Sequence, residues 1–171
     1  MPPLPLLKAD CSACAALCCM ALPFDKGEAF ARDKPALHPC PNLVRHGCTI
    51  HDRLEPAGYR GCVLYDCLGA GQRVVQEVFA GADWQADATL RAPMAEALGI
   101  LRRIHAALEL LVTAESLTLP EALAQERQTL IAIFHPEARW SPESLRGFAV
   151  SGADARLRGF LAALRPHVAP P

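Results

Sequence analysis

The apolar residues in the second half of the chain recur with the period of an α-helix. Successive members of one stripe are separated by four, three, four, three and four residues: Met94, Leu98, Leu101, His105, Leu108 and Val112. This spacing predicts a long amphipathic helix. It also predicts that His105 is a hydrogen-bonded core histidine, because it lies on the apolar face.

Helix start signals and a further apolar stripe predict three more helices after this one. Thr118-Leu119-Pro120-Glu121 combines a capping hydroxyl, a proline and a glutamate ahead of an apolar pattern that continues to Phe134. Ser141-Pro142-Glu143 repeats the start signal for a short helix. A last apolar stripe before Pro166 consists of Leu157, Phe160, Leu161 and Leu164. The C-terminal part is therefore predicted to be a small helical bundle.

The first part of the chain has a different pattern. Residues 1–67 contain few large aliphatic residues at a regular period, and strand signals are sparse. Residues 62–67 are consistent with a short extended segment, and residues 74–79 suit a helical turn equally well. The composition shifts near Gly69-Ala70-Gly71, which predicts a cysteine-rich module over residues 1–70 and a helical bundle over 71–171, packed as one compact unit. The fold class is mainly α, and the proline-rich end Ala169–Pro171 is expected to fray.

Cysteine dominates the chemistry of the first part. All eight cysteines fall between Cys11 and Cys67, beginning with the pattern C-x2-C-x3-C-C, and the remaining hundred or so residues contain none. The N-terminus lacks the charged start, long apolar run and cleavage site of a signal peptide, so we expect a cytoplasmic protein. Reduced thiols in that compartment favour metal coordination over the alternative, a disulfide scaffold. Coordination would also staple a segment that burial alone would hardly order.

The spacing of the first cysteines limits what they can share. Asp10 is placed to cap a helix that begins near Cys11, where the helix dipole would favour thiolates. On a regular helix Cys11 and Cys18 would lie about 10.5 Å apart along the axis, whereas two sulfurs on one zinc ion are about 3.8 Å apart. Either the C-x2-C part is a turn before the helix, or more than one metal is held. An iron-sulfur cluster would relax this limit.

The number of candidate ligands permits two sites. The candidates are the eight thiols and His51, which follows Cys48 at a C-x2-H spacing: Cys11, Cys14, Cys18, Cys19, Cys40, Cys48, His51, Cys62 and Cys67. One division, which is not unique, joins Cys11 and Cys14 to Cys48 and His51, and joins Cys18 or Cys19 to Cys40, Cys62 and Cys67. Alternatively, Cys18 or Cys19 is a small apolar core residue, because adjacent cysteines rarely chelate one ion. His38 and His46 are expected at the surface.

Net charge and hydropathy exclude two classes of partner. The formal charge is −1 for 171 residues, which gives no basic field for a phosphate backbone, so we expect no nucleic acid partner. The apolar stretches are too short or too charged to span a bilayer, so we expect no membrane partner.

Two sets of segments carry a resemblance to known families. The initial cysteine pattern, Cys40-Pro-Asn-Leu and Cys48-Thr-Ile-His51 resemble the YkgJ-like CxxCxxxCC family, which implies zinc or iron chelation. In that family Arg-Pro follows the histidine, whereas here Arg53 and Pro56 are separated. Three further segments resemble the N-terminal region of actinobacterial pentapeptide-repeat-containing proteins, without the repeats: residues 66–73, 81–84 and 101–105. Flagellin lysine methylases are similar at the cysteine cluster alone, which implies an iron-sulfur option.

Three functions follow as hypotheses. The first is a cytosolic protein that chelates zinc or iron through the cysteine cluster. The second is an iron-sulfur redox protein or enzyme, although no nucleophile, base and acid show a recognised catalytic spacing. The third is a metal-stapled module that binds a protein partner, which an exposed apolar patch beside Trp84 or Trp140 would favour.

Overall fold

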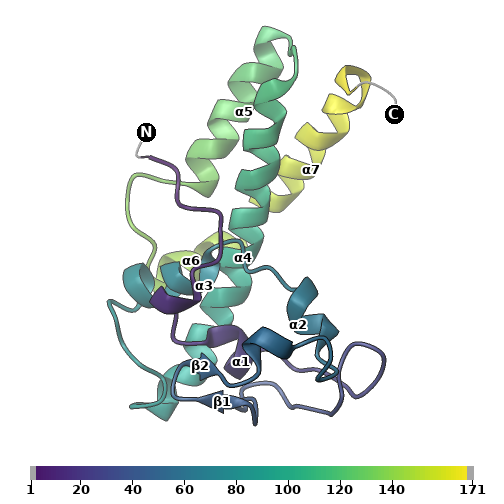
Figure 1. The fold of residues 1–171 in the computed structure, drawn as a ribbon. Helices are drawn as coiled ribbons and strands as arrows, with labels where there is room; N and C mark the ends of the chain where they lie inside the picture. The colour runs from purple at the N-terminus through teal and green to yellow at the C-terminus, as the bar shows by residue number, and fades with distance from the viewer. Residues whose placement is uncertain (1–2, 169–171) are drawn as a thin grey trace.

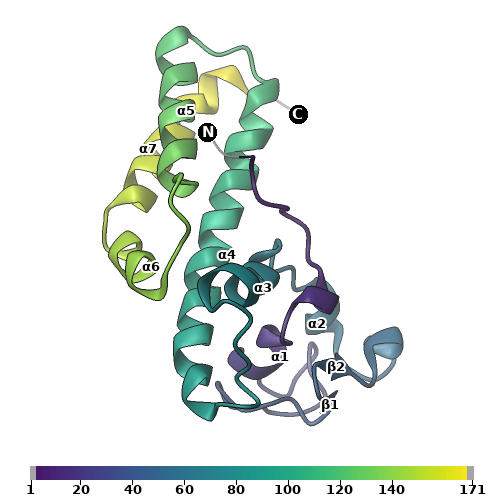
Figure 2. The same cartoon turned by 90° about the vertical axis from the view of Figure 1, so that its left-hand side faces the viewer.

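One long helix organises the molecule. A computed structural model describes residues 3–168, so the expectation for Ala169–Pro171 lies outside the described part. Helix α4 (Arg91–Thr113) is the longest described element, and Figures 1 and 2 show α5 and α7 beside its C-terminal end and the cysteine-rich segments around its other end. No helix within residues 3–168 combines the length and apolarity needed to cross a membrane. The mainly α fold class is confirmed.

The remaining elements are short. The described α-helices besides α4 are α1 (Leu17–Ala21), α2 (Arg60–Leu64), α3 (Ala70–Arg73), α5 (Glu121–Phe134), α6 (Pro142–Ala149) and α7 (Ala153–Leu164). The strands are β1 (Leu43–Val44) and β2 (Gly47–Cys48), which pair antiparallel. The 3-10 turns are η1 (Cys11–Ala13), η2 (His51–Arg53), η4 (Ala88–Leu90), η5 (Ala114–Ser116) and η6 (Arg165–His167), and η3 (Val74–Val78) is a π turn.

Helix α4 carries the predicted apolar stripe. Its inward positions from Met94 to Leu108 are buried, including His105, whose exposed fraction is 0%. The stripe ends at Leu111 rather than Val112, which is 37% exposed. This prediction was wrong by one position, because spacings of three and of four both fit the helical period.

The helical bundle follows the start signals with one exception. Ser141 caps α6 as predicted, since its Oγ accepts the amide of Ser144 at 3.1 Å. Helix α5 begins after Pro120 with no side-chain cap, so the capping role predicted for Thr118 was wrong. The stripe on α7 is buried at Leu157, Phe160 and Leu164, and Leu161 packs at its edge.

The two parts predicted from the sequence share one hydrophobic core. Leu17 and Met20 of α1 are fully buried and belong to the same cluster as the apolar face of α4. The indole of Trp84 is also buried, and its Nε1 donates to the carbonyl oxygen of Ala15 at 2.6 Å. The cysteine-rich part is therefore anchored on α4 through α1.

Residues 74–79 and 62–67, whose conformation the sequence left open, are helical over part or most of their length. Residues 74–78 continue α3 as the π turn η3, with Val74, Val75 and Val78 buried. The extended segment predicted for residues 62–67 is wrong in its first half, because α2 extends to Leu64 before the chain becomes extended at Tyr65.

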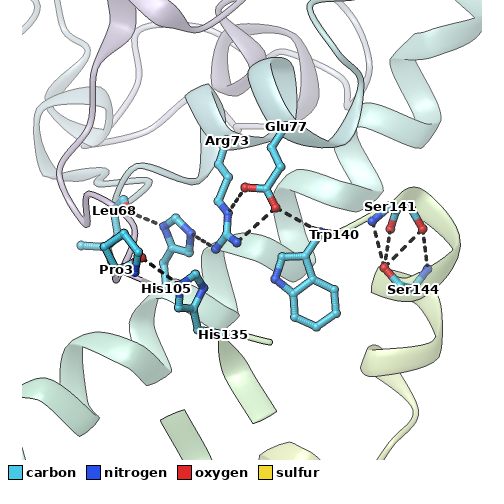
Figure 3. Close-up of polar contacts among 9 residues, drawn as sticks. All are labelled: Pro3, Leu68, Arg73, Glu77, His105, His135, Trp140, Ser141 and Ser144. Carbon is cyan, nitrogen blue, oxygen red and sulfur yellow. Dashed lines mark hydrogen bonds and ion pairs between the residues drawn. The ribbon is translucent and has the colours of Figure 1, made fainter. Parts of the chain in front are cut away.

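A buried polar network joins this segment to the bundle (Figure 3). Arg73 donates from Nε to Glu77 at 2.7 Å, and its Nη1 lies 3.3 Å from Nε2 of His105. Glu77 also accepts the backbone amide of Trp140 at 3.0 Å, so one carboxylate connects η3 to the loop before α6.

Candidate metal centre

The C-x2-C segment forms a turn ahead of α1. The carboxylate of Asp10 accepts the amide of Ser12 at 3.0 Å and caps η1, as its position predicted. The turn ends at Cys14, whose backbone is extended, and Ala16 then adopts a left-handed φ of 52° before α1 begins. Of the two alternatives left by the spacing, the turn before the helix is the one observed.

Side-chain amides hold this turn against α3 and η3. Gln72 accepts the amide of Asp10 at 3.0 Å and donates to the carbonyl oxygen of Lys8 at 2.8 Å. Gln76 donates to the carbonyl oxygen of Ala13 at 3.1 Å. These bonds span more than sixty residues of sequence and fix Cys11 and Cys14 beside the start of α3.

Gly71 lies where Cys14 and Cys67 meet. A Cβ atom at this glycine would lie 2.8 Å from Sγ of Cys14 and 3.8 Å from Sγ of Cys67. The absence of a side chain therefore makes room for two sulfurs from segments more than fifty residues apart.

Cys40 lies just before the β1–β2 hairpin, and Cys48 is the last residue of β2. The amide of Cys40 donates to the carbonyl oxygen of Cys19 at 2.9 Å, and Leu43 donates to that of Cys40 at 2.9 Å. Leu43 in turn pairs with Cys48 across the hairpin. Three cysteines are thereby joined through backbone contacts.

Cys62 belongs to α2, which an aromatic group supports. The amide of Cys62 donates to the carbonyl oxygen of Tyr59, a buried residue packed edge-on against Phe24 and Phe30. A Cβ at Gly61 would overlap the Phe30 ring, so the glycine allows α2 to approach it closely.

Burial and neighbouring thiols raise the pKa values of several cysteines. The pKa of Cys14 is raised to about 11, chiefly by burial and to a lesser extent by the thiols of Cys18, Cys67 and Cys11. Burial likewise raises the pKa of Cys62 to about 11, with contributions from Cys18, Cys40 and Cys48.

The adjacent pair on α1 is bound together by its own hydrogen bond. Cys19 donates to Cys18, which lowers the pKa of Cys18 to about 7 and raises that of Cys19. Both side chains are half-buried, so neither is a fully buried apolar core residue.

The expectation that the helix dipole favours thiolates at the first cysteines is wrong. The pKa of Cys11 is raised, first by burial and then by the neighbouring thiols of Cys18 and Cys67. The three-residue turn η1 is too short to sum a large dipole, so burial and like charges dominate.

Sequence reasoning missed a buried lysine that interacts electrostatically with three of the thiols. Nζ of Lys34 donates to the carbonyl oxygens of Met20, Pro35 and His38 at 3.1, 3.1 and 2.7 Å, and the residue is 4% exposed. Burial lowers the pKa of Lys34, and the thiols of Cys40, Cys19 and Cys18 oppose that shift. An ammonium group thus faces the cysteine-rich region.

The histidines divide as follows. His51 is exposed on η2, and within residues 3–168 its ring makes no hydrogen bond or ion pair. His38 and His46 are exposed, as predicted, and His46 contacts Asp83 at 3.1 Å. Whether His51 is a metal ligand therefore stays a prediction.

The arrangement stops short of a formed metal site. Among residues 3–168, no three histidine, cysteine, aspartate or glutamate side chains have the geometry of a metal-binding group. All eight cysteines are free thiols. Their chemistry suits soft tetrahedral cations, since thiolate sulfurs are the preferred ligands of zinc and of iron-sulfur clusters.

Comparison with known proteins finds a relative of similar sequence. The chain is similar to "Uncharacterized protein YybG" of Bacillus subtilis (strain 168), with 35% identity over 156 residues, which cover 91% of this chain and 56% of that protein. The chain thus spans about half the length of this curated relative. No protein-family model matches the chain. No solved structure matches it either.

Proposed function

We propose that the protein binds zinc or iron through its cysteine cluster and that the bound metal staples the cysteine-rich part to the helical bundle. One observation carries this proposal: sulfurs from two distant segments, those of Cys14 and Cys67, both lie within 4 Å of the Cβ position of Gly71 on α3. A Cβ atom at Gly71 would lie only 2.8 Å from Sγ of Cys14, so the sulfur is tightly packed there, as a thiolate ligand of a metal would be.

The distribution of secondary structure supports a stapling role. Between Ala21 and Ala70 the described elements are a two-stranded hairpin, a 3-10 turn and the five-residue helix α2. Such segments bury little apolar surface, and structural zinc contributes about 10 kcal/mol or more to the folding of small cysteine-rich units. A bound metal would hold the cysteines of this segment, between Ala21 and Ala70, in fixed positions.

Elemental analysis tests the proposal. Full-length protein purified without oxygen is expected to carry zinc or iron, and a strong chelator is expected to remove it together with part of the ordered structure seen by circular dichroism. Protein that contains neither metal, takes up neither Zn²⁺ nor Fe²⁺ when supplied, and keeps its spectrum in chelator would overturn the proposal.

The nature of the metal separates the first two hypotheses. Colourless protein with zinc would support a structural centre. Brown protein with iron, acid-labile sulfide and a reversible redox change would support the iron-sulfur alternative, for which the number of thiols is sufficient. The resemblance to YkgJ-like proteins supports chelation by either metal.

The protein-partner hypothesis rests on a different surface from the one first expected. Trp84 and Trp140 are buried, with exposed fractions of 1% and 7%. The exposed aliphatic side chains nearest the cluster in sequence are Val63 and Leu64, which directly follow Cys62 on α2. That a partner protein binds over these side chains of α2 stays a prediction. A pull-down that compares the wild-type protein with Leu64→Ser would test it.

A further inference from the structure

We propose that Cys14 and Cys67 form a reversible disulfide when the metal-free chain meets a low-molecular-weight disulfide such as glutathione disulfide. The bond would join the turn that ends at Cys14 to the residues just before α3, more than fifty residues further along the chain. This inference goes beyond the proposed function, because it concerns two sulfurs alone and needs no bound metal.

The sulfurs of Cys14 and Cys67 lie near one point in the structure. That point is the Cβ position of Gly71, which is 2.8 Å from Sγ of Cys14 and 3.8 Å from Sγ of Cys67. The two sulfurs are therefore no further apart than the sum of these distances, 6.6 Å. A disulfide brings its sulfurs to about 2.05 Å. Each sulfur can move between staggered χ1 rotamers, so rotation of the two side chains can close the gap.

Gly71 keeps the space beside these sulfurs open. It lies within the helix α3 and, unlike Gly69, does not have a positive φ, so its backbone conformation does not require glycine. A Cβ atom at this position would instead crowd Sγ of Cys14. Room for the sulfur is therefore the reason that the structure offers for a glycine here.

The two segments that carry the sulfurs are held in place by contacts of the chain itself. Gln76 donates to the carbonyl oxygen of Ala13 at 3.1 Å, which ties the turn that ends at Cys14 to η3. The carbonyl oxygen of Cys67 accepts the amide of Ala70 at 2.9 Å, which fixes Cys67 at the start of α3. These bonds would keep the pair together in the metal-free chain.

The reaction balances as a thiol–disulfide exchange. One thiolate of the pair attacks a sulfur of glutathione disulfide, which forms a mixed disulfide and releases one glutathione thiolate. The second thiolate of the pair attacks the protein sulfur of that mixed disulfide and releases the other glutathione thiolate. The chain loses two electrons and two protons, and two molecules of glutathione carry them away as thiols.

Oxidation would change what the pair can bind. Thiolates are the form of cysteine that binds metal, so the disulfide would withdraw Cys14 and Cys67 from the proposed metal centre. This consequence rests on the proposed function, whereas formation of the bond does not. Oxidation and metal binding would exclude each other at these two residues.

Peptide mapping of the full-length protein tests the bond. Reduced, chelator-treated protein is given one equivalent of glutathione disulfide without denaturant, and the remaining thiols are blocked with iodoacetamide. Trypsin leaves Cys14 in residues 9–26 and Cys67 in residues 61–73. We expect these two peptides to be linked, with six of the eight thiols blocked. Fragmentation of the linked peptides is expected to place the bond between Cys14 and Cys67.

Single variants locate the bond independently. Cys14→Ser and Cys67→Ser are each expected to abolish the link. Cys11→Ser and Cys62→Ser change a cysteine in the same two peptides and are the matched controls, which are expected to keep it. Fragmentation of the wild-type peptides decides the pairing even where a variant does not fold.

Three results would overturn the inference: a mixed disulfide with glutathione that does not close, a link between other cysteines, or a link that persists in Cys14→Ser. A chain that forms no link but binds zinc or iron would leave the proposed function intact. A chain that forms the link when oxidised but takes up neither metal when reduced would overturn the proposed function alone.

Discussion

The ring of His105 lies against the backbone of Leu68, with its Nδ1 2.6 Å from the Leu68 carbonyl oxygen. Nδ1 must donate, because the carbonyl can only accept, so the other nitrogen of a neutral ring accepts from Arg73. Leu68 follows Cys67 directly and has a left-handed φ of 51°. His105 of α4 thus fixes the backbone directly after Cys67, the last cysteine of the chain.

This contact predicts a pH dependence of stability. Burial lowers the pKa of His105 from 6.5 to about 4. Between pH 4 and 6.5 the unfolded chain therefore binds a proton at His105 that the folded chain excludes. The stabilisation that the neutral His105 gives to the folded state is complete above about pH 6.5 and is lost as the pH falls toward 4. This stabilisation is on the order of 3 kcal/mol. In denaturant titrations between pH 4 and 7, His105→Gln is expected to show a shallower loss of stability than wild type.

The matched control is His167→Gln on η6, which should keep the wild-type slope. If His105→Gln and wild type lose stability in parallel over this range, the buried neutral imidazole is not the cause.

The pairing of Arg73 with Glu77 predicts a graded series of mutants. Glu77→Ala leaves a buried guanidinium and the Trp140 amide without their acceptor, which is expected to lower the free energy of unfolding by about 2 to 3 kcal/mol. Glu77→Gln keeps an acceptor oxygen and should lose less. Thermal unfolding measures both, with the exposed Glu109→Gln as a control expected to change stability by less than about 0.5 kcal/mol. Equal losses in the two Glu77 variants would contradict the account.

Much of the bundle could be predicted from sequence, and less of the cysteine-rich part. The stripe from Met94 to Leu108 and the Ser141 cap depend on local spacing, which the sequence displays directly. Grouping of the thiols depends on contacts between distant segments, such as the Cys40–Cys19 backbone bond, which no local pattern encodes. Gly71 lies in the segment Gly69-Ala70-Gly71, where the composition shift placed the boundary between the two parts, but its closeness to Cys14 could be seen only in the fold.

Lys34 predicts an electrostatic effect on metal binding. Its buried ammonium group interacts electrostatically with the thiols of Cys40, Cys19 and Cys18, and a thiolate-bound metal would carry net negative charge there, so Lys34→Met is expected to weaken zinc binding roughly tenfold, since such a charge interaction is worth about 1 to 2 kcal/mol. Competition with a chromophoric chelator measures the affinity. The exposed Lys26→Met is the control and should bind as wild type does. Lys34→Met also leaves three carbonyl oxygens without their donor, so its melting temperature is expected to fall. If the folded variant binds zinc with unchanged affinity, Lys34 has no electrostatic role in metal binding.

Gly71 provides the sharpest steric test of metal binding by Cys14. The methyl group of Gly71→Ala would meet Sγ of Cys14 at 2.8 Å and displace it, whereas alanine in a helix otherwise gains about 1 kcal/mol over glycine. Gly99→Ala on α4 is the matched control, because no atom lies within 4 Å of its Cβ position and helix propensity acts there alone. We expect Gly71→Ala to bind less cobalt per chain than wild type, and Gly99→Ala to bind as much as wild type with a slightly raised melting temperature. Wild-type cobalt binding with wild-type spectra in Gly71→Ala would show that Cys14 is not a ligand at that position, since its sulfur could not then remain where the metal requires it.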